Sequence, residues 1–149
     1  MCIRDSSNIG GCESSGPEMK LAIIGTGYVG LVTGACFAEL GHDVTCVEID
    51  PDKVEKLRSG SIPIHEPGLD EIVERQAALG RLRFTTELAD PVCHADAVFI
   101  CVPTPQSPDG HADLRFVERA ASDIAHALCG YTVVVNKSTV PVGLSLIHI

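Results

Sequence analysis

Short apolar runs alternate with segments of helical period along most of this chain. The apolar runs end in glycine or polar residues, as buried strands of a parallel sheet do, and we expect strands at KLAIIGTG, DVTCVEI, RLRFTT, DAVFICV and YTVVVNKS. The helical segments predict helices over about 29–40, 51–60, 69–79 and 116–128. Parallel neighbours need crossover connections, and helices must cover both faces of such a sheet. The alternation therefore predicts an α/β fold with a doubly wound parallel sheet.

The helix predictions depend on the spacing of apolar residues and on the residues at the helix ends. In the first helix, the residues that recur at helical spacing are Val29, Val32, Cys36, Phe37 and Leu40. In the last helix, we expect the inward face to hold Phe116, Val117, Ala120, Ala121, Ile124 and Leu128. Asp50 is suited to cap the second helix, with Pro51 at its first position.

The two ends of the chain differ from the alternating region. Residues 7–18 are rich in Gly and Ser and have no period, which indicates a flexible lead-in. The first and last hexapeptides, MCIRDS and LSLIHI, back-translate to one DNA element in opposite orientations, and they resemble the ends of a sequencing adaptor. We therefore expect 1–18 and 144–149 to be non-native, and 19–143 to be one domain of a longer protein.

Charge and composition argue against several classes of function. The net charge of -9 and the pI of about 5.0 argue against a nucleic-acid backbone or an anionic membrane as partner. No apolar run approaches the ~20 residues of a membrane span. We find no signal peptide before Met19, so a cytoplasmic location is the default expectation.

The cysteines and histidines do not form a recognisable metal or redox motif. The chain has 7 Cys and no Cys-x-x-Cys pair, and no two of its His residues stand at a metal-ligand spacing with carboxylates. Cys36, Cys46, Cys93, Cys101 and Cys129 fall within apolar runs. We expect them to be reduced and to serve as small core hydrophobes, and we expect no metal.

The hexapeptide GTGYVG follows the first predicted strand and opens the first predicted helix. Gly25, Gly27 and Gly30 match the Gly-x-Gly-x-x-Gly spacing, which permits a tight turn, a close pyrophosphate and a helix packed near the strand. The N-H groups at the start of the helix would hold the phosphates. The motif alone is weak, but Glu48 at the end of the next strand completes the dinucleotide fingerprint.

Glu48 also indicates which dinucleotide is bound. Its carboxylate can accept hydrogen bonds from the adenosine ribose hydroxyls and would repel a 2'-phosphate, which favours NAD over NADP. Asp50 is a nearby competitor for this role. Lys53 weakens the argument, because a cation close to the ribose is compatible with a phosphate.

Three motifs in order resemble the N-terminal domain of the UDP-glucose 6-dehydrogenase family over nearly all of 19–143. They are the stretch that begins KLAIIGTGYVG and ends HEPGL, the segment VFICVPTPQ, and the segment VVVNKSTVPVG. The resemblance implies a Rossmann-type NAD-binding domain. It further implies an enzyme that oxidises UDP-glucose to UDP-glucuronate with two NAD, in two successive hydride transfers.

The resemblance also implies roles for individual residues. It assigns the pyrophosphate turn to Gly25, Thr26, Gly27, Tyr28, Val29 and Gly30, the adenosine ribose to Glu48 and Lys53, and a loop beside the cofactor to Thr104. Ser138 and Thr139 match the segment near the nicotinamide, and Thr139 is the catalytic candidate, positioning the substrate or a water. From the residues alone, Ser-Thr before Pro is equally local turn chemistry, and VPTP is equally a rigid loop.

Two family signatures depart from the pattern or are absent. Many relatives have Asp in place of Glu48 and Tyr in place of His65, in the HEPGL segment that we interpret as a turn opening a helix. The catalytic Cys, Lys and Asp of the family lie in a later domain. We therefore expect this chain to hold half an active site and to be inactive alone, with its Cys residues away from Ser138 and Thr139. The complete protein is expected to bind a nucleotide sugar and to be a homo-oligomer.

Three alternatives remain open on the sequence. GDP-mannose and UDP-N-acetylmannosamine dehydrogenases share all three motifs, although GTGYVGLVTGACFAELGHDV is most similar to the UDP-glucose enzymes. A non-catalytic NAD-sensing module would also begin with a strand, a glycine turn and an acidic strand end. It would give no reason for VPTP followed by KSTVPVG. A nonfunctional translated fragment is the third alternative.

Overall fold

The computed structural model of this chain describes residues 18–64, 66–106 and 112–140. The helices and strands follow one another as β1 (Lys20–Ile24), α1 (Tyr28–Glu39), β2 (Asp43–Val47), α2 (Pro51–Arg58), α3 (Leu69–Ala78), β3 (Leu82–Thr85), α4 (Ala89–Cys93), β4 (Ala97–Ile100), α5 (Arg115–Ala127) and β5 (Val133–Asn136). His65 and the ends that we expect to be non-native, Glu18 excepted, lie outside the described residues.

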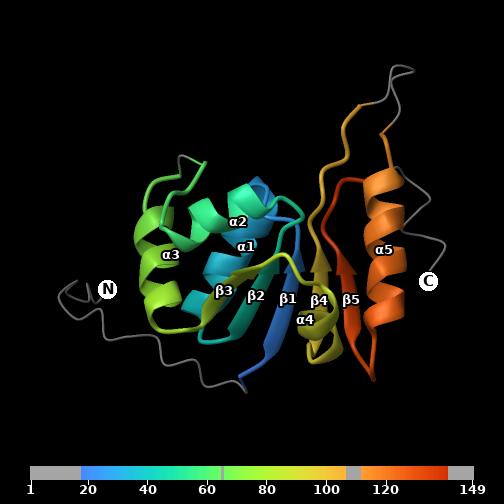
Figure 1. Cartoon of the computed structure of the whole chain (residues 1–149), viewed down its shortest axis with the longest axis horizontal. Helices are drawn as coiled ribbons and strands as arrows, with labels where there is room; N and C mark the ends of the chain where they lie inside the picture. The colour runs from blue at the N-terminus through green and yellow to red at the C-terminus, as the bar shows by residue number, and fades with distance from the viewer. Residues whose placement is uncertain (1–17, 65, 107–111, 141–149) are drawn as a thin grey trace, which may run out of the picture.

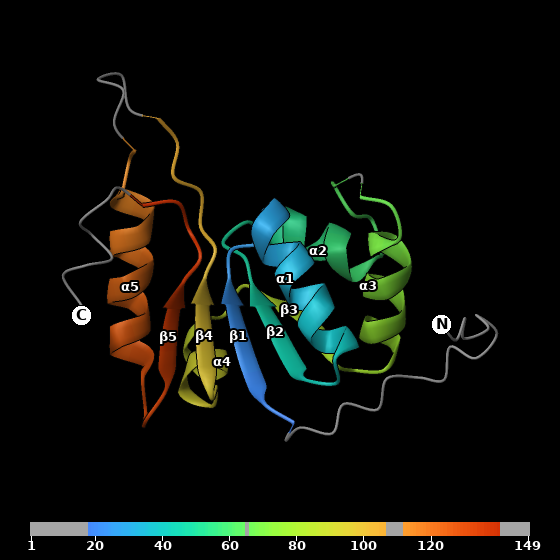
Figure 2. The same ribbon diagram turned by 180° about the vertical axis from the view of Figure 1, so that it is seen from behind.

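The strands form one parallel sheet in the order β3-β2-β1-β4-β5 (Figure 1). Figures 1 and 2 show its two faces: α1, α2 and α3 cover one, and α4 and α5 cover the other. Because successive side chains of a strand point to opposite faces, β1 contributes to both cores. Leu21 and Ile23 pack under the first group of helices, and Ala22 and Ile24 under the second. The predicted doubly wound parallel sheet is confirmed.

The centre of the sheet is where the chain changes direction. β1 pairs with β2 on one side and with β4 on the other. After β1 the chain crosses one face through α1, whereas after β4 it crosses the opposite face through α5 (Figure 2). Open α/β sheets bind their ligands at such a point, beyond the carboxyl ends of the strands.

The apolar stripe that predicts α1 coincides only in part with the face that this helix buries, since Val32 and Phe37 are half-buried against the core. Its buried residues are Gly30, Leu31, Gly34, Ala35 and Ala38, whereas Val29 is 45% exposed and Cys36 is exposed. Small side chains face the sheet because the helix lies very close to it. A Cβ at Gly34 would lie 2.8 Å from Sγ of Cys46.

α5 and α4 depart from prediction in different ways. In α5, Val117, Ala120 and Ile124 are buried as predicted, but the predicted inward residues Phe116, Ala121 and Leu128 are exposed. The short helix α4 was not predicted. It has 5 residues, too few to reveal a helical period. In α2, the predicted cap is confirmed, since Asp50 accepts hydrogen bonds from the N-H groups at the start of the helix.

The prediction that the cysteines are reduced core residues is wrong for three of the five. Cys46 and Cys101 are buried free thiols, as expected for core residues, but Cys36 is exposed, and Cys93 and Cys129 form a disulfide with a Cα–Cα distance of 4.9 Å. The bonded pair lies 36 residues apart, at the end of α4 and just after α5. Because α4 and α5 pack on the same face of the sheet, the fold brings these two cysteines together. Their spacing in the sequence gives no sign of this pairing.

No helix within the described ranges is long and apolar enough to cross a membrane.

We predict that reducing the Cys93–Cys129 disulfide destabilises the domain by about 2–4 kcal/mol, because the bond closes a long loop and restricts the unfolded chain. Urea unfolding with and without a thiol reductant measures this difference. Cys93→Ser should reproduce the effect of the reductant and remove further sensitivity to it. The matched control is Cys36→Ser, which removes a free thiol and should leave the difference intact. An unchanged midpoint in reductant would contradict a structural role for the bond.

Candidate nucleotide-binding cleft

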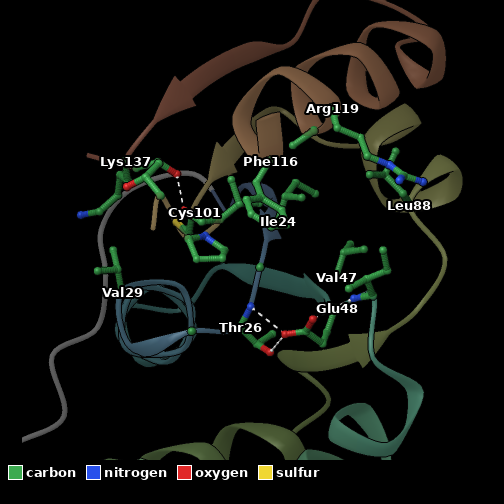
Figure 3. A pocket seen from close by; sticks show the side chains of 18 of the residues that line it. Ile24, Thr26, Val29, Val47, Glu48, Leu88, Cys101, Phe116, Arg119 and Lys137 are labelled. Atoms are coloured by element: carbon green, nitrogen blue, oxygen red, sulfur yellow. Dashed lines mark hydrogen bonds between the residues drawn. The ribbon is translucent and has the colours of Figure 1, made fainter. Parts of the chain in front are cut away.

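A cavity of about 760 Å³ lies at the carboxyl edge of the sheet. The residues that line it are 24–29, 47–49, 53, 86, 88, 101–104, 116, 119, 120, 123 and 137–139. Figure 3 shows side chains from β1, β2, α5 and the segment after β5 around one space. All of the predicted site residues line this cavity except Gly30, which lies in the helix behind it. The fold therefore gathers segments more than a hundred residues apart.

The space available for a side chain differs among the three glycines of the turn after β1. Gly25 has a φ of +98°, and a Cβ there would lie 2.8 Å from the carbonyl oxygen of Cys101. A Cβ at Gly30 would lie 1.9 Å from the carbonyl oxygen of Gly25. A Cβ at Gly27 would meet nothing within 4 Å. The first and third glycines are thus required by packing, whereas the second leaves open space at the cavity.

Gly27 is also the N-cap of α1, and as a glycine it makes no side-chain hydrogen bond that caps this helix. The first N-H groups of an α-helix have no partner within the helix, and the helix dipole places partial positive charge there. Since Gly27 and the first two helical residues line the cavity, the start of α1 is suited to an anionic group.

Glu48 is held in place from several sides. Its Oε2 accepts hydrogen bonds from Oγ1 of Thr26 at 2.5 Å and from Nζ of Lys53 at 2.7 Å, and its Oε1 accepts one from the N-H of Ile49 at 2.9 Å. Partial burial opposes ionisation of this carboxyl, but the hydrogen bonds and the charge of Lys53 outweigh it, so the pKa of Glu48 lies below its usual value. The carboxylate is therefore ionised at neutral pH.

The segment after β5 is fixed to the end of β4. Oγ of Ser138 donates to the carbonyl oxygen of Val102 at 2.8 Å, and the N-H of Ser138 donates to that of Ile100 at 3.1 Å. The serine hydroxyl therefore joins two loops that line the cavity. Thr139 is exposed beside it, and Thr104 is half-buried in the loop after β4.

Cys101 corrects the expectation that the cysteines lie away from Ser138 and Thr139. It directly follows β4 and lines the same cavity as both residues, because the parallel strands β4 and β5 end at the same edge. Burial raises the pKa of its thiol to about 11, although the charge of Lys137 acts in the opposite direction. A thiol that stays protonated at neutral pH is a poor nucleophile.

Other cavity residues were not predicted as site residues. Phe116 and Arg119 enter from α5, and Leu88 from the segment before α4 (Figure 3). Ile49, immediately after Glu48, also lines the cavity and is 81% exposed. The sequence offered one signal for Ile49 as a site residue, which is its apolar side chain directly after the acidic residue at the end of the strand. The α5 residues carry no such signal, because the amphipathic pattern of a helix does not say which end of it meets a cavity.

Tyr28 connects the glycine turn with the HEPGL segment. Its hydroxyl donates to Oε2 of Glu66 at 3.0 Å. The hydrogen bond to Glu66, together with the charge of that carboxylate, raises the pKa of Tyr28. The sequence singles out both motifs but not the contact between them, which spans 38 residues.

Among the residues that the structure describes, no three His, Cys, Asp or Glu side chains form a group that could hold a metal ion.

A parallel sheet whose first strand passes through a glycine turn into an uncapped helix, with a carboxylate at the end of the next strand, defines a dinucleotide-binding domain. Comparison with known families agrees with this class. The NAD binding domain of the UDP-glucose/GDP-mannose dehydrogenase family matches residues 19–146, and the chain belongs to this family.

The most similar proteins include several UDP-glucose 6-dehydrogenases. The enzyme of Rhizobium meliloti (strain 1021) is 57% identical over 126 residues, covering 84% of this chain and 29% of the relative. UDP-glucose 6-dehydrogenase TuaD of Bacillus subtilis (strain 168) is 52% identical over 124 residues, covering 83% and 27%. The chain thus spans less than a third of the length of these relatives.

Solved structures of related enzymes have the same fold. A UDP-glucose dehydrogenase from the hyperthermophilic archaeon Pyrobaculum islandicum superposes with a TM-score of 0.81 at 45% identity, over 85% of this chain and 30% of the other. A GDP-mannose dehydrogenase from Pseudomonas aeruginosa gives a TM-score of 0.79 at 36% identity, over 82% and 29%. The predicted family and NAD as its cofactor are confirmed.

We predict that Gly30→Ala destabilises the domain by about 3 kcal/mol, because the new methyl group would overlap the Gly25 carbonyl oxygen and force the helix away from the turn. The matched control is Gly27→Ala in the same motif, which adds a methyl group in open space and should destabilise the domain by about 1 kcal/mol or less, through the poorer N-cap alone. Urea unfolding of the two variants measures both effects. Equal stability of the two variants would refute the close-packing argument.

Proposed function

We propose that the cavity at the carboxyl edge of the sheet binds NAD, with the pyrophosphate at the start of α1 and the adenosine ribose at Glu48. The observation that carries this proposal is the open space at Gly27, at the uncapped end of α1, in the same cavity as an ionised carboxylate. A helix N-terminus without a side-chain cap favours a phosphate, and a carboxylate favours a hydroxyl donor over another anion.

The residues of the cavity fit the chemical parts of NAD. The start of α1, from Gly27 to Val29, would hold the pyrophosphate, and Glu48 with Lys53 would hold the ribose. The exposed side chain of Ile49 offers an apolar surface for the adenine. Thr104, Ser138 and Thr139 lie on the other side of the cavity, where they would face the nicotinamide. When bound, NAD supplies a hydride acceptor.

We propose that the complete protein oxidises UDP-glucose to UDP-glucuronate. Support comes from the relatives above 50% identity, which are named UDP-glucose 6-dehydrogenases, whereas a GDP-mannose 6-dehydrogenase is 36% identical. The role that we assign to Thr139 is to position the substrate or a water, because its exposed hydroxyl can both donate and accept. Ser138 would hold that segment in register, since its own hydroxyl donates to Val102.

We propose residues 19–143 as the bounds of the NAD-binding domain. The family match over residues 19–146 supports the start of this range and runs slightly past its end. The covalent steps of the reaction are assigned to residues beyond this domain. Cys101 is the only free thiol among the described residues that lines the cavity, and its raised pKa makes it unsuited to nucleophilic attack.

We predict that the chain binds NAD more tightly than NADP and that Gly27→Ala weakens NAD binding by about 10-fold or more, equivalent to about 1.4 kcal/mol. The added methyl group would occupy the space through which the backbone approaches the pyrophosphate. Isothermal titration calorimetry with both dinucleotides measures this. Gly130→Ala is the matched control, because a Cβ there also meets nothing within 4 Å and the residue does not line the cavity. NADP binding equal to or tighter than NAD would refute the ribose assignment to Glu48.

We predict that the 149-residue chain gives no NADH from UDP-glucose, because the substrate must be held beside the nicotinamide. Positioning of this kind can account for about 7–11 kcal/mol of a reaction barrier. The measurement is NADH absorbance for this chain and for a protein of the full length of the relatives. In the longer protein, Thr139→Ala should lower turnover while leaving NAD affinity within a few-fold. Turnover by the short chain would disprove the half-site, and unchanged turnover in the variant would remove Thr139 from the reaction.

A further inference from the structure

Thr26 is a fully buried polar residue in the middle of the glycine turn, with 0% of its surface exposed. The family resemblance assigns it to the pyrophosphate turn, but its side chain contacts Glu48 instead (Figure 3). Oγ1 donates to Oε2 of Glu48 at 2.5 Å, and the N-H of Thr26 donates to the same oxygen at 3.3 Å. A buried hydroxyl and a backbone N-H thus converge on one carboxylate oxygen.

Lys53, in α2, contacts the same oxygen of Glu48. Its Nζ lies 2.7 Å from Oε2, with 29% of the Lys53 side chain and 11% of the Glu48 side chain exposed. Glu48 therefore neutralises Lys53 within the cavity. A lysine held in this ion pair is not free to bind a phosphate on the ribose.

We propose that Thr26 is a positioning residue that sets the selectivity for NAD over NADP, by holding the Glu48 carboxylate where it both accepts a ribose hydroxyl and neutralises Lys53. This inference rests on the proposed function of the cavity. Without the Thr26 hydroxyl, the carboxylate loses a charge-assisted hydrogen bond and is held less firmly, by Lys53 and backbone N-H groups alone. The ribose then loses a fixed acceptor, and Lys53 is less fully neutralised and therefore more available to a 2'-phosphate.

The charge state of Glu48 gives this role a signature in pH. The pKa of Glu48 is lowered in the folded protein, so the carboxylate persists to a lower pH than usual, and NAD affinity is lost as the pH falls through that lowered pKa. Removing the Thr26 hydrogen bond raises the pKa, so the loss begins at a higher pH. The charged side chains that share the cavity with Glu48 are Lys53 from α2, Arg119 and Asp123 from α5, and Lys137 after β5.

The test compares Thr26→Val, which removes the hydroxyl at nearly constant volume, with Thr26→Ser, which keeps it. Calorimetry with NAD and NADP at several pH values should give a loss of NAD affinity of about 10-fold in the valine variant. NADP affinity should fall less or rise, so the ratio of NAD affinity to NADP affinity (the selectivity ratio) decreases. The loss of NAD affinity at low pH, which we call the acid limb, should begin at a higher pH. The serine variant should restore the ratio and the acid limb.

A purely structural role for Thr26 predicts something else. Both dinucleotides would then weaken equally in Thr26→Val, with the acid limb unchanged, and this result overturns the inference while NAD binding by the unmodified chain still supports the proposed function. A chain that binds neither dinucleotide overturns the proposed function itself, and the selectivity with it.

A second pair of variants tests the role of Lys53 if Thr26→Val does not fold. Glu48→Gln removes the charge that neutralises Lys53 and should raise NADP affinity by about 10-fold relative to NAD. The double variant Glu48→Gln/Lys53→Met should lose that gain. If Glu48→Gln leaves the ratio of the two affinities unchanged, the carboxylate does not set selectivity and the role of Thr26 is overturned.

Discussion

The close approach of α1 to the turn after β1 is the constraint on which the rest of the cavity depends. The carbonyl oxygen of Gly25 lies where a Cβ of Gly30 would otherwise be, and the carbonyl of Cys101 limits Gly25 from the other side. The turn is therefore fixed between the helix and β4. Because a helix N-terminus attracts anions only within its first turn, this packing decides where a phosphate can be held.

Local charge in this cavity matters more than the charge of the whole protein. The chain carries a net charge of -9, yet the proposed ligand is an anion. Charges farther away than about 8–10 Å are largely screened at physiological ionic strength, so the start of α1 and nearby cations dominate. Glu48 adds a negative charge at one end of the cavity, where hydroxyl groups are to be bound. The separation of these two environments orients a ligand that has both kinds of group.

Much of the fold followed from particular residues of the sequence. The strand predictions succeeded because buried parallel strands are continuous apolar runs, and Gly25 and Glu48 could be located relative to those runs. The buried face of α1 was not predictable from hydrophobicity, since Gly30 and Gly34 face the sheet because they are small and not because they are apolar. The Cys93–Cys129 bond and the position of Cys101 depend on which strand ends and helices are neighbours in space.

The sequence by itself determined the doubly wound sheet, the glycine turn and the acidic strand end, because each depends on residues close together in the chain. The three family motifs were likewise local. Only the tertiary structure decided that Thr26 contacts Glu48, that Tyr28 contacts Glu66, and that Phe116 faces the cavity. Those contacts join separate elements, and their geometry follows from the order of strands in the sheet and the closeness of helix packing. The spacing of residues along the chain specifies neither the strand order nor the closeness of helix packing.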